Sequence, residues 1–109
     1  MEVTIDFSKI QNWDTFHKVF SQVMGFPSFY GKNMDAWIDC MSYIDDPGAG
    51  MSAVTVGKNE SLDINVLGTE DAFKHCLEIF QAFIECTGFV NQRFIESESE
   101  TRLKIIATL

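Results

Sequence analysis

The sequence has little positive charge and no long apolar run. Eight Lys and Arg stand against sixteen Asp and Glu, which gives a formal net charge of −8 over 109 residues. No stretch gathers cations, so we expect no direct binding to nucleic acid and none to an anionic membrane surface. No run of about 18 apolar residues could span a bilayer. A basic partner would complement this charge, although an acidic balance also serves solubility alone.

Signal-peptide features and metal-binding cysteine motifs are also missing. Met1 is followed at once by the alternating EVTIDF, without a basic region and an apolar region that would direct export. We therefore expect a cytoplasmic protein. Cys40, Cys76 and Cys86 are odd in number and form neither a CxxC motif nor a Cys/His cluster with zinc spacing. We interpret them as buried, reduced thiols and expect no metal and no cofactor.

Apolar and aromatic side chains are abundant. The chain is 46% hydrophobic and contains ten Phe, which favours a folded protein over a disordered one. Its length suits one domain over residues 1–109, with one core and no linker or repeat. We expect a monomer before any partner binds.

Periodicity divides the first half of the chain into a strand and two helices. Residues 2–7 alternate as a strand does, and Asn12 can cap a helix that Gly25 ends. A second helix begins after Gly31 with Asn33 as its cap, and it ends before the loop DDPGAG at 45–50. The first helix has one apolar stripe, formed by Trp13, Phe16, Phe20, Val23 and Met24.

The second half is predicted to hold two further strands and a long helix. MSAVTV at 51–56 is interpreted as a buried strand, and SLDINVL at 61–67 as an edge strand or an ordered loop. Thr69 would cap a helix that Gly88 ends, with FVNQRF from Phe89 as a further helical turn. LKIIATL at 103–109 is apolar enough to be a central strand. The inner face of the long helix would consist of Phe73, Cys76, Leu77, Phe80, Phe83 and Ile84.

The order strand, helix, helix, strand, helix, strand predicts an α/β fold. Helical crossovers between strands favour parallel pairing, so we expect a small three-stranded parallel sheet packed by helices. Residues 61–67 would add an extra edge strand if they pair.

The second helix places two carboxylates together. At 100° per residue, Asp35 and Asp39 share one face, and their repulsion at this spacing disfavours the helix by roughly 0.2–0.5 kcal/mol. Asp35 recovers part of this from the helix dipole because it lies in the first turn. A separate stripe faces the core and consists of Met34, Trp37, Ile38, Met41 and Ile44.

Four interpretations of the aspartate pair remain open from the residues alone. The pair could supply acid and base, bind a divalent metal with Asp45 and Asp46, attract a cationic partner, or form a merely solvated face. No HExxH motif, Gly-rich phosphate loop or nucleophile elbow accompanies it, so we expect no enzyme. We interpret His17 and His75 as partly buried helix residues rather than catalytic bases.

The run FYGKNMDAWIDCM resembles the signature of the barstar family, the intracellular inhibitors of barnase-type ribonucleases. The matched positions form an ungapped core of Tyr30, Gly31, Asn33, Asp35, Ala36, Asp39 and Cys40. The resemblance implies a barstar-like fold and a function without catalysis. The order of the remaining elements is similar as well, so the resemblance covers most of the chain.

The resemblance also implies a site. Asp39, with Asp35 beside it, would face the cationic active site of a ribonuclease or nuclease toxin, as in an immunity protein. Contacts at Phe29, Tyr30, Gly31 and Asn33 would join them. The repulsion between the aspartates is then expected to be relieved only when the cationic partner docks. The alternative is an acidic binding module of the same fold with a basic partner that is not a nuclease.

Three positions depart from the family pattern. Phe29 lacks the hydroxyl of the Tyr that family members often carry there. Ala82 aligns with a Glu that the family's best-known member presents from its third helix. Trp37 and Ile38 exchange the usual order of apolar and aromatic residues. We therefore expect a similar mode of binding with a cognate enzyme that need not be barnase.

Overall fold

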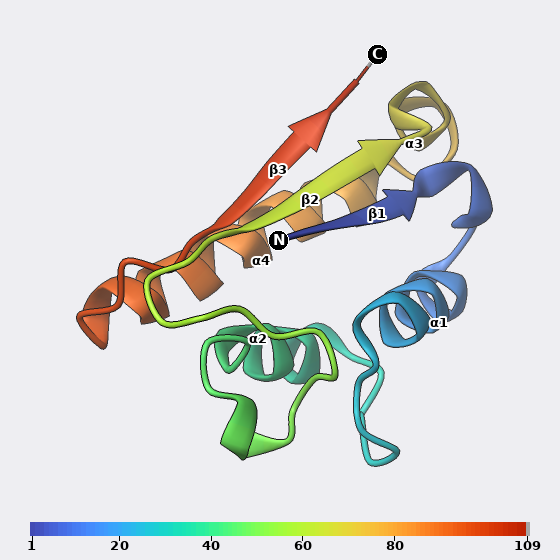
Figure 1. The fold of residues 1–109 in the computed structure, drawn as a ribbon. Coiled ribbons are helices and arrows are strands. Elements are labelled where there is room, and N and C mark those ends of the chain that lie inside the picture. Colours follow the sequence, from blue (N-terminus) through green and yellow to red (C-terminus); the bar gives the residue numbers. More distant parts are fainter. Residues whose placement is uncertain (109) are drawn as a thin grey trace.

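The computed structural model describes residues 1–108, which form a three-stranded parallel sheet and four α-helices (Figure 1). The strands lie in the order β1-β2-β3, so β2 is central. This confirms the predicted fold class and the order of its elements. The elements are β1 (Glu2–Asp6), the 3-10 helix η1 (Phe7–Lys9), α1 (Trp13–Met24), α2 (Met34–Ser42), the 3-10 helix η2 (Pro47–Ala49), β2 (Leu62–Leu67), α3 (Thr69–His75), α4 (Leu77–Glu96) and β3 (Leu103–Ala107).

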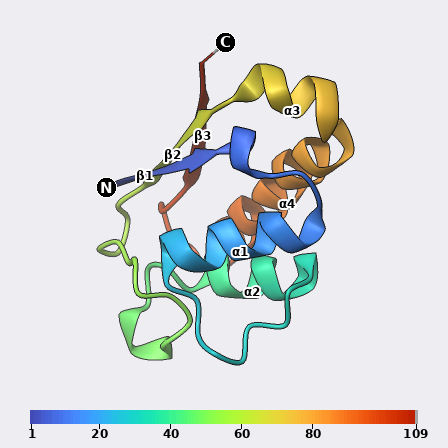
Figure 2. The ribbon, with the colours of Figure 1, turned by 90° about the vertical axis from the view of Figure 1, so that its right-hand side faces the viewer.

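All four helices lie on one side of the sheet (Figure 2). The alternation within β2 fits this arrangement, because Leu62, Ile64 and Val66 are buried beneath the helices. Asp63 and Asn65 are only partly buried, on the face that no helix covers. The sheet is thus apolar towards the helices and polar on its other face, as period-2 patterning requires.

Aromatic rings from three helices meet beneath the sheet. Phe20 of α1, Trp37 of α2 and Phe83 of α4 have ring centroids 5.5 to 6.0 Å apart. All three side chains are fully buried. Such offset and edge contacts add to the burial of large apolar surfaces, so this cluster fixes α2 against its neighbours.

The central strand is not the one that the sequence favoured. LKIIATL was expected to be central, but β3 lies at the edge of the sheet and Ile106 is half exposed; its last predicted residue, Leu109, lies outside the described residues. SLDINVL was assigned to an edge strand or a loop, yet it forms β2 and pairs on both sides. The tertiary arrangement overrode apolar content here, because one face of the sheet is open to solvent and accepts polar residues.

The expected strand at MSAVTV is also wrong. Residues 51–56 are irregular, and their amides bond to helix ends instead of a strand: Ala53 and Val54 donate to the carbonyl of Met24. Gly25 permits this approach, since it has φ of +67° and a Cβ at this position would collide with Ala53. The segment therefore covers the end of α1 and leaves the sheet with three strands among the described residues.

The predicted long helix is two helices. The helical backbone breaks at Cys76, which has φ of −147° and ψ of 45° and separates α3 from α4. The cap of α3 is Gly68, whereas the sequence predicted Thr69. Gly88 does not end α4, which continues to Glu96. Burial of residues beyond the glycine, such as Val90 and Phe94, offsets its cost of about 1 kcal/mol.

The break also divides the predicted inner face of that helix. Cys76, Phe80 and Phe83 are buried as expected. The remaining three side chains are about half exposed, which corrects their assignment to the core: Phe73, Leu77 and Ile84. Apolar spacing continues across the break, so periodicity alone could not reveal it.

Several other local predictions are confirmed, although Trp13 of the predicted α1 stripe is 38% exposed. Asn12 caps α1 in a capping box with Thr15, and Gly25 ends the helix in the left-handed region. The three cysteines are free and buried, and burial raises the pKa of each thiol. A side chain also ties the start of β3 to α4: Asn91 accepts from the amide of Leu103 and donates to its carbonyl.

Candidate functional site

The cap and the core stripe of α2 set the direction of its outer face. Asn33 Oδ1 accepts the amide of Ala36 at 2.8 Å and so begins the helix where the sequence predicted. The stripe is confirmed: Trp37, Met41 and Ile44 are fully buried, and Met34 and Ile38 pack against the core with partial burial.

The opposite face of α2 is acidic and open. Asp35 and Asp39 are both exposed, and the Asp39 side chain keeps 54% of its accessible surface. They lie one turn apart in a chain with a net charge of −8. We call this pair, with the loop residues from Phe29 to Asn33, the α2 face.

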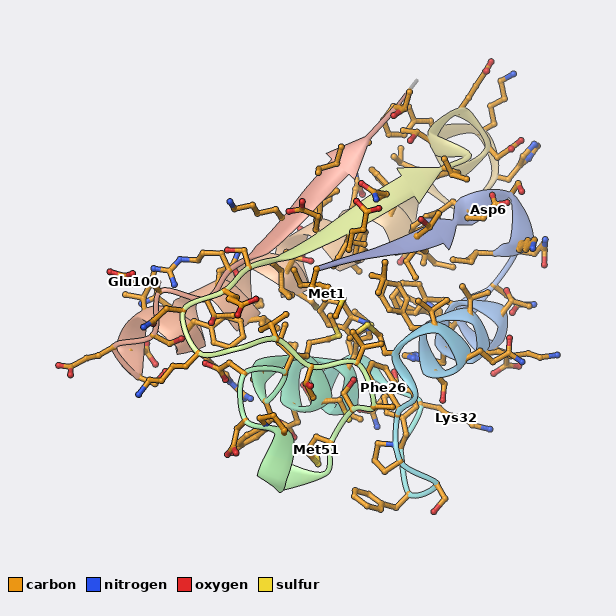
Figure 3. All side chains as sticks on the ribbon, in the orientation of Figure 1. Met1, Asp6, Phe26, Lys32, Met51 and Glu100 are labelled. Atoms are coloured by element: carbon orange, nitrogen blue, oxygen red, sulfur yellow. The ribbon has the colours of Figure 1, made fainter. Side chains whose placement is uncertain are left out.

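A hollow of about 260 Å³ lies beside α2 and brings four of the predicted residues together. It is lined by Phe29, Tyr30, Gly31 and Asp39, along with residues of α2 and Met51. Phe29 is 71% exposed, the largest exposure of any large hydrophobic residue described. Lys32, next to the hollow, extends from the loop into solvent (Figure 3). An exposed aromatic ring beside a carboxylate suits a cationic side chain of a partner. The cation would pair with the carboxylate, and the planar group or aliphatic stem that carries it would lie on the ring.

Tyr30 lies in this hollow but points its polar end inward. Its side chain is 8% exposed, and its hydroxyl shares a hydrogen bond of 2.6 Å with Nδ1 of His17. Burial raises the pKa of Tyr30, and burial likewise lowers the pKa of His17, with Asp14 opposing and Lys32 adding to the shift. The Tyr30 hydroxyl therefore supports the loop, and Asn33 is likewise engaged as the cap of α2.

Asp35 lines a different hollow, between α2 and α4. This second hollow, of about 380 Å³, is bounded by Asp35 and Ile38 of α2 and by Phe89, Gln92, Arg93 and Glu96 of α4. Phe89 is 61% exposed. Five of the six predicted residues thus divide over two hollows along α2, and Asn33 lines neither.

Arg93 forms an ion pair with Asp39 that the sequence did not predict. Its Nη1 donates to Asp39 Oδ1 at 2.7 Å, and both side chains are about half exposed. The expectation that only a docking partner would relieve the repulsion between the aspartates is therefore wrong. Arg93 comes from the segment after Gly88, which the sequence predicted only as a further helical turn, so its proximity to α2 was not foreseen.

The other candidate chemistries receive no support from the geometry. Asp45 accepts the hydroxyl of Ser99 at 2.8 Å. Within residues 1–108, no group of three or more His, Cys, Asp or Glu side chains is arranged to hold a metal ion. His17 is buried against Tyr30, whereas His75 is exposed, contrary to the expectation of partial burial. No helix in the described part of the chain is long and apolar enough to cross a membrane.

α4 supplies the residues that sequence reasoning missed. Ala82 is only partly buried and offers no charge, as the sequence indicated. Two turns or more along the same helix, Phe89, Gln92, Arg93 and Glu96 border the α2 face. Their spacing of three and four residues marks a common helical side, which would have identified them once the helix was extended beyond Gly88.

Comparison with known proteins gives one finding that covers nearly the whole chain. A family model described as Barstar (barnase inhibitor) matches residues 1–104 of the 109. No curated protein matches the sequence. The matched range includes every strand and helix described above up to the first residues of β3.

Proposed function

The chain belongs to the barstar family, and on that premise we propose that it inhibits a basic ribonuclease or nuclease toxin by placing the α2 face in the enzyme's active site. One observation carries this proposal. Asp35 and Asp39 project from a helix whose opposite side is packed into the core, so the backbone that carries them is fixed before any partner arrives. Preorganised groups lose little freedom on binding, which favours affinity.

The proposed mechanism is replacement of a phosphate by a carboxylate. A ribonuclease binds the phosphates of RNA with cationic side chains, and an aspartate offers the same charge with oxygen acceptors. Arg–carboxylate pairs that lose water on docking are strong and directional. The net charge of −8 would in addition steer the protein towards a cationic site and speed association. The family's inhibitors act by binding, so no catalytic step is proposed for this chain.

The biological setting follows from the same proposal. An inhibitor of this kind protects the cell that makes it, so we propose that the protein acts in the cytoplasm as an immunity protein. It would be a monomer that forms a one-to-one complex. A reading frame for a secreted or toxin-terminal nuclease beside its gene would support this role.

The departures at Phe29 and Ala82 favour a cognate enzyme other than barnase. A ring at position 29 preserves a stacking contact but offers no hydroxyl for a hydrogen bond. Ala82 leaves α4 without the charge that the aligned Glu contributes in the family's best-known member. Neutralisation assays should therefore include both barnase and any nuclease encoded beside the gene, and a basic partner without nuclease activity would favour the alternative binding module.

The test is an Asp39→Ala variant in an inhibition assay with calorimetry. We expect the complex to weaken by more than about 2 kcal/mol, the threshold for a hot spot, a general range that includes measurements on barnase and barstar themselves. Glu2→Gln is the matched control, since it also removes one negative charge but lies at the start of β1, away from α2. Unchanged inhibition by Asp39→Ala would show that Asp39 is not a contact.

A further inference from the structure

Arg93 occupies the place on Asp39 that a partner's cation would need. The two residues lie 54 positions apart in the sequence and meet because α4 packs against α2. One guanidinium nitrogen contacts one carboxylate oxygen at 2.7 Å. The free protein therefore presents Asp39 as one half of an ion pair.

The surroundings of Arg93 are strongly acidic. Its side chain borders the hollow that contains Asp35 and Glu96, and it also borders a hollow of about 260 Å³ that contains Asp45 and Asp46. Among the described residues that line these two hollows, Arg93 is the one cation. It consequently interrupts an acidic surface that would otherwise run from α2 to the end of α4.

The pair is of a kind that a better cation can displace. Both partners are about half exposed, and exposed ion pairs contribute little because water competes for both charges. The single contact also leaves the bidentate geometry of an Arg–carboxylate pair unused. A partner cation that contacts both oxygens of Asp39 and excludes water would thus displace Arg93, whereas a weakly matched cation would not.

We propose that Arg93 is a specificity-determining residue of the α2 face: it competes with the partner for Asp39, so that only a partner cation that displaces it binds tightly. This inference rests on the proposed function of that face. In physical terms, a partner whose cation displaces Arg93 pays only the small free energy of an exposed ion pair, whereas a partner whose cation does not displace it docks against the positive charge that stays on Asp39. The discrimination is of the repulsive kind that specific interfaces use alongside attraction.

The test compares Arg93→Ala with Lys74→Ala, with barnase as the probe. Lys74 is paired with Glu70 at 3.0 Å on α3, so each substitution removes one surface ion pair and one positive charge, and each takes the net charge from −8 to −9. Arg93→Ala should bind about two- to fivefold more tightly than Lys74→Ala, the range that an exposed ion pair covers. An equal gain in both variants would reflect the added negative charge alone and would overturn the proposal.

Two further outcomes are distinct. Weaker binding by Arg93→Ala, together with weaker binding by Asp39→Ala, would mean that Arg93 itself contacts the enzyme; the competition would be refuted while the proposed function stood. If wild type and every variant fail to bind barnase, the probe becomes L-argininamide, followed through the side-chain carboxyl ¹³C signal of Asp39. That signal should respond at about two- to fivefold lower concentration in Arg93→Ala than in Lys74→Ala, and coincident curves would overturn the proposal whatever the natural partner.

Discussion

The two faces of α2 place opposite demands on the same nine residues. On the inner face, Trp37 and Met41 are fully buried, and their shape is fixed by the rings and helices around them. On the outer face, Asp35 and Asp39 repel each other and contribute little to packing. The contrast separates an inner face that the core requires from an outer face that stays open to solvent, which is the face proposed above to bind a partner. Substitutions on each face can break or sharpen this division.

The largest effect is expected on the inner face. Trp37→Ala should lower the free energy of unfolding by about 3–5 kcal/mol, because a large cavity would open between α1, α2 and α4. Urea denaturation at neutral pH would measure it. Trp37→Phe is the control: it keeps a ring and also removes the indole N–H, which has no hydrogen-bond partner among the described residues. A loss as large for Phe as for Ala would mean that packing is not the cause.

A substitution at Tyr30 tests the loop that precedes α2. Tyr30→Phe should destabilise the protein by about 1–3 kcal/mol, because Nδ1 of the buried His17 would lose its partner. Phe29 is the neighbouring residue, but its side chain is 71% exposed. Phe29→Ala should therefore change the free energy of unfolding by less than about 0.5 kcal/mol. Equal losses of thermal stability in the two variants would contradict the assignment of Tyr30 to support and Phe29 to contact.

The same pair predicts a dependence of stability on pH. Burial lowers the pKa of His17 in the folded protein, so the unfolded chain binds more protons just below the ordinary value of 6.5. Stability from this group is therefore complete above pH 6.5 and is lost as the pH falls towards the lowered value. Chemical denaturation of wild type and His17→Gln across this range would show it, since the variant should lack that part of the slope.

The smallest effect on stability is expected on the outer face. Asp39→Asn removes a repulsion of roughly 0.2–0.5 kcal/mol and an exposed ion pair worth about 0–1 kcal/mol, so the free energy of unfolding should change by less than about 1 kcal/mol. Binding to the ribonuclease should nevertheless fall sharply. A variant that unfolds much more easily than wild type would place Asp39 among the structural residues.

Predictions from the sequence succeeded where structure is decided by neighbours in the chain. Asn12 and Asn33 cap their helices because a side-chain oxygen reaches amides two or three residues away. The core stripe of α2 follows from 100° per residue. By contrast, MSAVTV and SLDINVL have similar apolar content, and only the pairing of β2 with both neighbours decides which of them is the strand. The break at Cys76 was equally invisible, since apolar spacing continues through it.

The amino-acid sequence by itself therefore determined α2, its cap, the face that carries Asp35 and Asp39, and the resemblance to a family of ribonuclease inhibitors. Only the tertiary structure decided that Arg93 lies on Asp39, because the contact joins residues 54 positions apart and depends on how α4 packs. The physical reason is the distance along the chain over which each interaction acts. Caps and helical faces come from interactions within a few residues, whereas the state of the Asp39 carboxylate depends on which distant charge the fold brings to it.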